Sequence, residues 1–170
     1  MGAWIGRLSW AAGVLIASLL PAMAADEYEL GVRAYNDGEF GKAIESLIPL
    51  VERGHPGAET MLGVMYLRGQ GYPQDVGLAA VWLYKAASKG EPGAQLVLGS
   101  QHLFGWGVAR NLVRAYVWLT LAAQGDAADV VEQANSYRAE AALGMTTDQI
   151  ERAERLAAAW SPVAGRFTTE

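Results

Sequence analysis

Apolar side chains recur with helical spacing in the middle of the chain. Between residues 75 and 90 they stand three or four positions apart, which places them on one face of an α-helix. The residues on this face are Ala79, Trp82, Leu83, Ala86 and Ala87. Asp75 is expected to cap the start of the helix, and Gly90 is expected to end it.

The same pattern returns after a fixed interval of 36 residues. Leu62-Gly63 recurs as Leu98-Gly99, Trp82-Leu83 recurs as Trp118-Leu119, and Asn111 takes the capping position of Asp75. A period of this length indicates a solenoid whose stacked units are each too small to bury an apolar face alone. Each unit is predicted to be a helix pair. The helices are expected at 57–68 and 75–89, and again at 93–104 and 111–124, with Pro56 and Pro92 in first turns.

The two copies are flanked by less regular helical segments. Residues 26–56 form a divergent first copy, in which Leu30-Gly31 matches Leu62-Gly63. After Gly125 the period stops, and two helices within 127–160 are expected to cap the solenoid. Asp126 should cap the first of them, and the capping box Thr146-x-x-Gln149 should open the second. The predicted fold is therefore an all-α, α/α superhelical solenoid with C-terminal capping helices and a flexible tail at 161–170.

The first 24 residues are expected to be a cleavable signal peptide. Arg7 supplies a positive start, Leu8 to Leu20 is an uncharged and mostly apolar run, and Ala22-Met23-Ala24 fits a cleavage site. Cleavage would leave a chain that begins at Ala25 and is periplasmic or secreted, with no membrane contact. An uncleaved anchor is the alternative, although the run is short for a membrane span.

Composition narrows the range of partners. The chain carries a formal net charge of −5, whereas nucleic-acid-binding proteins need clustered Lys and Arg, so we expect no nucleic-acid partner. There is no cysteine, which excludes disulfides and attachment of a lipid through a thiol. About 146 residues after cleavage correspond to a single domain.

The repeated motif resembles a known repeat family. Ala58-x3-Leu62-Gly63-x2-Tyr66-x2-Gly69-x-Gly71-x3-Asp75-x3-Ala79-x2-Trp82-Leu83 is similar to the Sel-1-like repeat, a 36-residue relative of the tetratricopeptide repeat. On this resemblance, 57–92 and 93–126 are Sel-1-like repeats and 26–56 is closer to the tetratricopeptide form. The resemblance implies a superhelix that binds proteins or peptides on its concave side, often in bacterial envelopes.

Some repeat positions are explained by packing alone. Gly63 and Gly99 are expected to be structural positions of the repeat, while Trp82 and Trp118 are expected to be largely buried between helices. Tyr66 is a further structural position, and His102 stands at its place in the next repeat. His102 is therefore expected to pack, and His55, in a turn before Pro56, is expected to be solvated.

The sequence offers no recognisable catalytic or metal-binding group. His55 and His102 are the only histidines, no H-x-x-x-H pair occurs, and no nucleophile motif surrounds Ser100. We therefore predict no catalytic residue, no metal site and no cofactor, and we expect a protein that is not an enzyme.

Residues that vary between the repeats are the candidates for partner binding. Trp106 lies between two glycines where the preceding repeat has Gln70, which makes it a candidate anchor. Its alternative placement is against the helix at 111–124. The predicted partner-binding set, on the concave wall and the loop tips, is Val64, Arg68, Tyr72, Ser100, Phe104 and Trp106.

These observations predict an exported helical-repeat scaffold that binds a protein or a peptide. Two other functions stay open at this point. One is an envelope enzyme of the hydrolase type with an unrecognised cleft, and the other is a structural subunit that packs through its convex face. Burial of Trp106, Phe104 and Arg68 on the concave or the convex side would separate the scaffold from the structural subunit.

Overall fold

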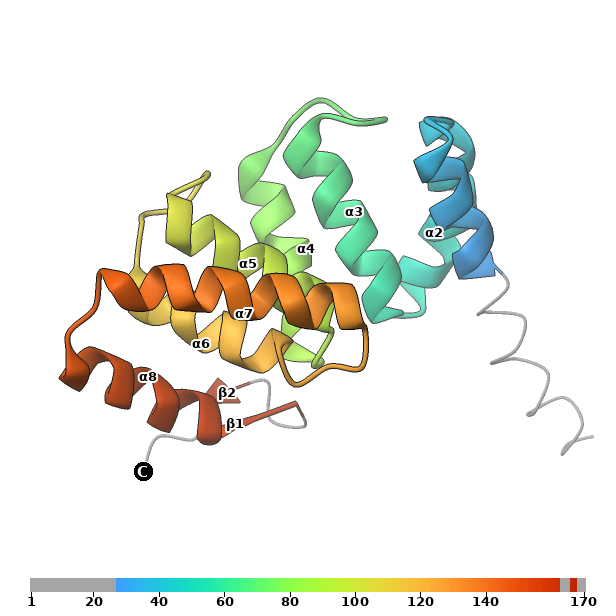
Figure 1. The fold of residues 1–170 in the computed structure, drawn as a ribbon. Helices are drawn as coiled ribbons and strands as arrows, with labels where there is room; N and C mark the ends of the chain where they lie inside the picture. The colour runs from blue at the N-terminus through green and yellow to red at the C-terminus, as the bar shows by residue number, and fades with distance from the viewer. Residues whose placement is uncertain (1–26, 163–165, 168–170) are drawn as a thin grey trace, which may run out of the picture.

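The structure, a computed structural model, describes residues 27–162 and 166–167, and this part of the chain contains eight helices (Figure 1). A helix over 27–36 comes first, and the others follow in chain order. They are α2 (Phe40–Glu52), α3 (Pro56–Arg68), α4 (Val76–Ser88), α5 (Pro92–Phe104), α6 (Leu112–Ala122), α7 (Ala128–Leu143) and α8 (Thr147–Ala158). The all-α solenoid prediction is confirmed, and the predicted helices of the two repeats agree with the structure to within two residues.

Consecutive helices pack as pairs, and the pairs stack on one another. Helix α3 packs against α4 and α5 packs against α6, while α7 packs against both α5 and α6 (Figure 1). A Cβ atom added at Gly63 would lie 2.8 Å from Cγ of Leu83, and one at Gly99 would lie 2.6 Å from Cγ of Leu119. Both distances are too short for a real contact, so the repeated Leu-Gly motif is explained by the close approach of the two helices in each pair.

Most of the predicted helix starts are confirmed. The side chains of Asp75 and Asn111 accept hydrogen bonds from the backbone N–H groups of Leu78 and Arg114, at 2.8 and 3.0 Å. Thr146 and Gln149 form the expected capping box at the start of α8. These side chains satisfy N–H groups that the first turn of a helix leaves without a partner.

Two expectations about helix starts are wrong. Asp126 does not cap α7, because Ala127 occupies the N-cap position and no side chain bonds to the first turn. His55 is not simply solvated, since its Nδ1 accepts from the backbone N–H of Ala58 at 3.2 Å and caps α3. Its ring also lies 4.9 Å from the ring of Tyr28, which joins the first helix to α3.

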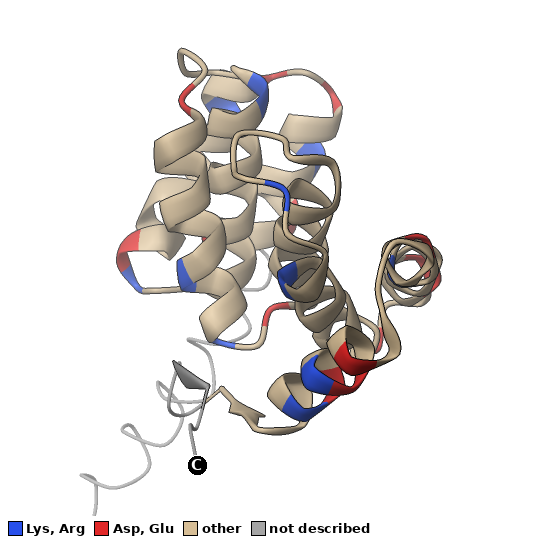
Figure 2. Cartoon of the chain, turned by 90° about the vertical axis from the view of Figure 1, so that its left-hand side faces the viewer, with Lys and Arg blue, Asp and Glu red and all other residues tan. Residues whose placement is uncertain are grey.

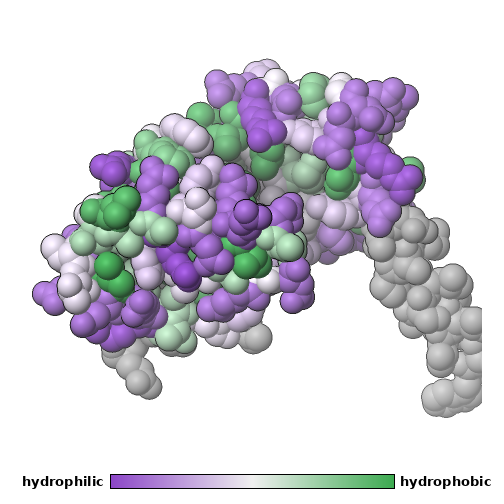
Figure 3. Space-filling view, in the orientation of Figure 1, coloured by the Kyte–Doolittle hydropathy of each residue, from purple (hydrophilic) through white to green (hydrophobic). Residues whose placement is uncertain are grey.

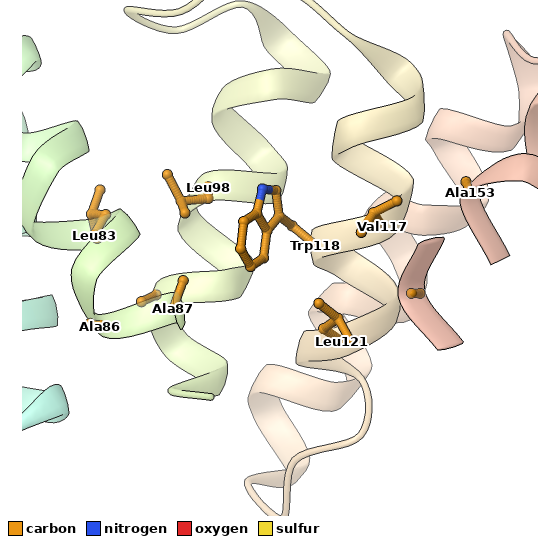
Figure 4. Packing of buried hydrophobic residues seen from close by; sticks show 10 residues of the cluster. Leu83, Ala86, Ala87, Leu98, Val117, Trp118, Leu121 and Ala153 are labelled. Carbon is orange, nitrogen blue, oxygen red and sulfur yellow. The ribbon is translucent and has the colours of Figure 1, made fainter. Parts of the chain in front are cut away.

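The core cluster around Trp118 joins four helices. Trp118 on α6 is 5% exposed and points toward Leu98 of α5 and Ala87 of α4, while Val117 of α6 lies on the side of Ala153 of α8 (Figure 4). Its predicted burial is confirmed. Trp82 is only partly buried, and the ammonium of Lys85 lies 4.7 Å from its ring, so the prediction holds for this residue only in part.

A buried ion pair connects α3 to α4 and has no counterpart in the next repeat. Glu59 is 0% exposed, and its carboxylate lies 2.8 Å from Nζ of Lys85 and 2.7 Å from Nζ of Lys89. Lys89 also donates to the carbonyl oxygen of Gly54 at 2.8 Å. A carboxylate buried to this extent needs such partners, because an uncompensated charge in the interior costs several kcal/mol (about 3–5 when a partner is removed). The corresponding residue of the next repeat is the neutral Gln95.

The C-terminal segment contains a short strand pair that the sequence did not predict. β1 (Trp160–Ser161) and β2 (Arg166–Phe167) are antiparallel, with Trp160 opposite Phe167 and Ser161 opposite Arg166. The expectation of a flexible tail over 161–170 is wrong for the residues in this pairing. A Cβ atom at Gly90 would meet the Trp160 ring at 3.5 Å, so β1 lies against the turn between α4 and α5.

The predicted signal peptide, residues 1–24, lies outside the described residues. Within the described part of the chain, every helix is too short or too polar to cross a lipid bilayer.

Candidate functional site

A groove runs across the first helices of successive pairs. Side chains of α3, α5 and α7 line it, together with the loops that follow α3 and α5, and they enclose about 600 Å³. Four residues of the predicted partner-binding set meet there: Val64, Arg68, Ser100 and Trp106. Comparison of the repeats therefore selected residues from three separate segments that line one surface.

Trp106 is the most prominent side chain of the groove. It is 57% exposed, and its ring stacks on Phe104 with the ring centroids 4.6 Å apart and the planes at 29°. Phe104 in turn meets the ring of Tyr137 on α7 edge to face, at 5.4 Å and 88°. Trp106 does not fold back on the helix at 111–124 and stacks instead on the last residue of α5. A supported but exposed indole offers a large apolar area with few rotatable bonds.

Arg68 is the one charged residue among the described residues that line the groove. Its Nη1 donates to the hydroxyl of Tyr35 at 2.9 Å, and that hydroxyl lies 2.5 Å from Oε1 of Gln70. A side chain of the first helix therefore holds the guanidinium in place. Gln70 and Arg68 correspond to Trp106 and Phe104 of the next repeat. The same two repeat positions are therefore polar in the first Sel1 repeat and aromatic in the second.

Tyr72 lies apart from the other predicted site residues. Its ring stacks on Tyr66 at 4.6 Å and 19°, and it packs against the core cluster formed by α2 and α3. Burial, and then the neighbouring Tyr66, raise the pKa of Tyr72, so the phenol stays neutral at physiological pH. Tyr72 packs against this cluster and is not among the residues that line the groove.

Sequence reasoning missed eight of the twelve residues that line the groove, among them the two that α7 contributes. Gln133 and Tyr137 on α7 line it opposite α3. Both follow Gly125, where the repeat period ends, so no comparison between repeats could have selected them. The helical spacing of 133 and 137 was the available signal, because residues four apart share one helix face.

The chemistry of the groove is that of binding. Its lining, within the described residues, has no carboxylate, imidazole or thiol. The part of the chain that the structure describes also has no group of three or more His, Cys, Asp or Glu side chains that could hold a metal ion. Apolar contact, amide hydrogen bonds and one guanidinium are the means by which this groove can hold a ligand.

Acidic and basic residues are interspersed along the described chain, for example on α8 (Figure 2). On the face shown in Figure 3, hydrophobic residues form separate small patches among hydrophilic ones. The mixture of charges on α8 differs from the clustered Lys and Arg surface that nucleic-acid-binding proteins use.

The fold and the groove together define an α/α repeat protein of the superhelical type. The family model described as Sel1 repeat matches residues 56–91 and 92–126, and the chain belongs to this family. The resemblance to the Sel-1-like repeat family, indicated by the sequence motif, is thus confirmed. No curated protein matches the sequence.

The solved structures that are similar to this chain include two proteins with the same type of repeat. A Sel1 repeat protein from Oxalobacter formigenes is 33% identical, with a TM-score of 0.53, over 66% of this chain and 88% of that one. A protective antigen present in uropathogenic Escherichia coli strains, which displays an SLR fold, is 29% identical with a TM-score of 0.72. That comparison covers 84% of this chain but 31% of the antigen, so the present chain spans about a third of its length.

Proposed function

We propose that this protein is a scaffold that binds a segment of another protein in the groove between α3, α5 and α7. The observation that carries the proposal is Trp106, an exposed indole stacked on Phe104 at the edge of a groove that two repeats build jointly. Large aromatic side chains in such positions are typical anchors of protein interfaces. Sel1 repeats generally mediate protein–protein interaction, which supports the same function.

The polarity of the groove favours a segment with two kinds of side chain. An apolar residue would rest against Trp106 and Tyr137, and a carboxylate or carbonyl group would accept from Arg68. The hydrolase alternative is less well supported, because the described lining lacks a nucleophile paired with a base. Photo-crosslinking tests the alternative of a structural subunit that packs through its convex face.

Site-specific photo-crosslinking separates a partner in the groove from a partner on another face. A photoreactive residue replaces Gln133, which is exposed in the groove, or Val81, which is 61% exposed on α4 and does not line it. The full chain is irradiated in native cells. We expect an adduct with one partner protein from position 133 and none from position 81. Adducts from position 81 alone, or from neither position, would contradict the proposal.

We also propose that the protein is exported and that its signal peptide is removed. Arg7, the apolar run and Ala22-Met23-Ala24 support this location. N-terminal sequencing of protein from fractionated cells is expected to give Ala25 as the first residue, in the periplasmic or the secreted fraction. Protein that retains Met1 and stays in the cytosol would disprove export.

A further inference from the structure

A second cavity lies on the other side of α5. The groove uses Leu96, Val97 and Ser100 of this helix, whereas the cavity uses Leu98 and His102. At 3.6 residues per turn these two sets point in nearly opposite directions. Side chains of α4, α6 and α8 complete the cavity, which has a volume of about 420 Å³. This size falls within the range of small-molecule sites.

Comparison of the two repeats shows how the residues around this cavity differ from those of the preceding repeat. In the first Sel1 repeat, Tyr66 and Tyr72 stack on each other. The corresponding positions of the second repeat hold His102 and Val108, which are smaller. Leu78 is likewise replaced by Arg114, which lines the cavity. Two of these differences lie in the cavity lining: His102 is a smaller ring than the tyrosine it replaces, and Arg114 adds a positive charge.

The walls of the cavity are mostly apolar. Leu98, Val113, Val117 and Leu156 contribute aliphatic surface. Tyr84 and Trp118 contribute two rings that meet edge to face at 6.1 Å and 85°. Such a surface suits the hydrocarbon part of a ligand, because every apolar contact removes area from water.

The side chains of His102 and Arg114 supply polar groups to the cavity. Nδ1 of His102 lies 3.4 Å from the carbonyl oxygen of Ala109, which can only accept, so Nδ1 carries the hydrogen and Nε2 is an acceptor. Burial lowers the pKa of His102, and Arg114 acts in the same direction, so the imidazole is neutral at physiological pH. Arg114 is exposed, and none of the described residues forms an ion pair with its guanidinium.

We propose that this cavity binds a small amphiphilic carboxylate, with its hydrocarbon part between α4, α6 and α8 and its carboxylate on Arg114. Charge complementarity carries the choice of an anion. The described lining has one permanent cation and no carboxylate, in a chain with a formal net charge of −5. The site is independent of the groove and of any partner bound there.

Octanoate is the probe that tests the proposal, with 1-octanol as the uncharged match. Because the chain has two histidines, the imidazole signals of His102 and His55 can be followed separately by NMR. Octanoate is expected to shift the His102 signals in a saturable manner and to leave His55 unchanged. By calorimetry, 1-octanol should bind at least fivefold more weakly. The proposal would be overturned if the shift of the His102 signals did not saturate, or if octanoate mainly shifted the His55 signals. Binding of 1-octanol that is as strong as that of octanoate would also overturn it.

Matched variants keep the test falsifiable if one of them folds poorly. Arg114→Gln removes the exposed charge and should weaken octanoate binding about tenfold, in line with the loss of a charge-assisted hydrogen bond. Arg33→Gln removes an exposed charge at the other end of the chain and should have no effect. His102→Tyr restores the residue of the preceding repeat and should abolish binding by filling the cavity. Unchanged affinity in both Arg114→Gln and His102→Tyr would show that octanoate binds elsewhere.

Discussion

Replacement of Trp118 by alanine is expected to lower the free energy of unfolding by about 3–5 kcal/mol, as large-to-small changes in a core do. The indole is 5% exposed and lies where α4, α5 and α6 meet (Figure 4). Truncation removes apolar contacts that join α6 to α4 and α5, and it leaves a void that the stacked pairs cannot close without moving. Each Sel1 repeat depends on its neighbour for burial, so the whole stack should weaken.

The matched comparison is Trp82→Ala, which changes the same repeat position one unit earlier. Trp82 is only partly buried and has Lys85 over its ring, so we expect a smaller loss than for Trp118→Ala. Urea unfolding followed by the helical circular dichroism signal measures both. An unchanged midpoint for Trp118→Ala, or a larger loss for Trp82→Ala, would show that the core is wrongly assigned.

The fold was predictable because the repeat imposes it twice. Leu-Gly at 62–63 and again at 98–99 requires the same close helix contact in both units, and the structure places a leucine of the partner helix at each glycine. The prediction that Asp126 caps α7 is wrong because Asp126 precedes the N-cap residue, Ala127, by one position. The Glu59–Lys85–Lys89 ion pairs could not be predicted, because charged residues on a helix are ordinarily solvated and only the packing of α3 on α4 buries the carboxylate.

The candidate site was predictable where the two repeats differ from each other. Trp106 stood out against Gln70, and the structure places it exposed beside Arg68 and Ser100. Tyr72 was misjudged because its loop position indicated a rim residue, whereas its ring has a stacking partner in Tyr66. The contribution of α7 depends on how the last helices fold back over α5, which a local pattern does not encode.

Replacement of Trp106 by alanine is expected to weaken partner binding by about 2 kcal/mol or more, which is roughly a 30-fold increase in Kd. The reason is the loss of a preorganised apolar surface that Phe104 supports from behind and that is 57% exposed in the free protein. Because the indole is outside the core clusters, the helix content should be unchanged. Trp106→Gln, which copies Gln70 of the preceding repeat, should give a similar loss.

The most direct test of the groove as the binding surface is a titration of the crosslinked partner, once purified, against wild type, Trp106→Gln and Val81→Ala. Val81 is the matched control, being an exposed apolar residue that does not line the groove. The account predicts that Kd rises at least about 30-fold for Trp106→Gln, the change of a hot-spot residue, and stays at the wild-type value for Val81→Ala. Wild-type affinity in Trp106→Gln, with weakened binding in Val81→Ala, would contradict the account and place the partner on the other face of the helices.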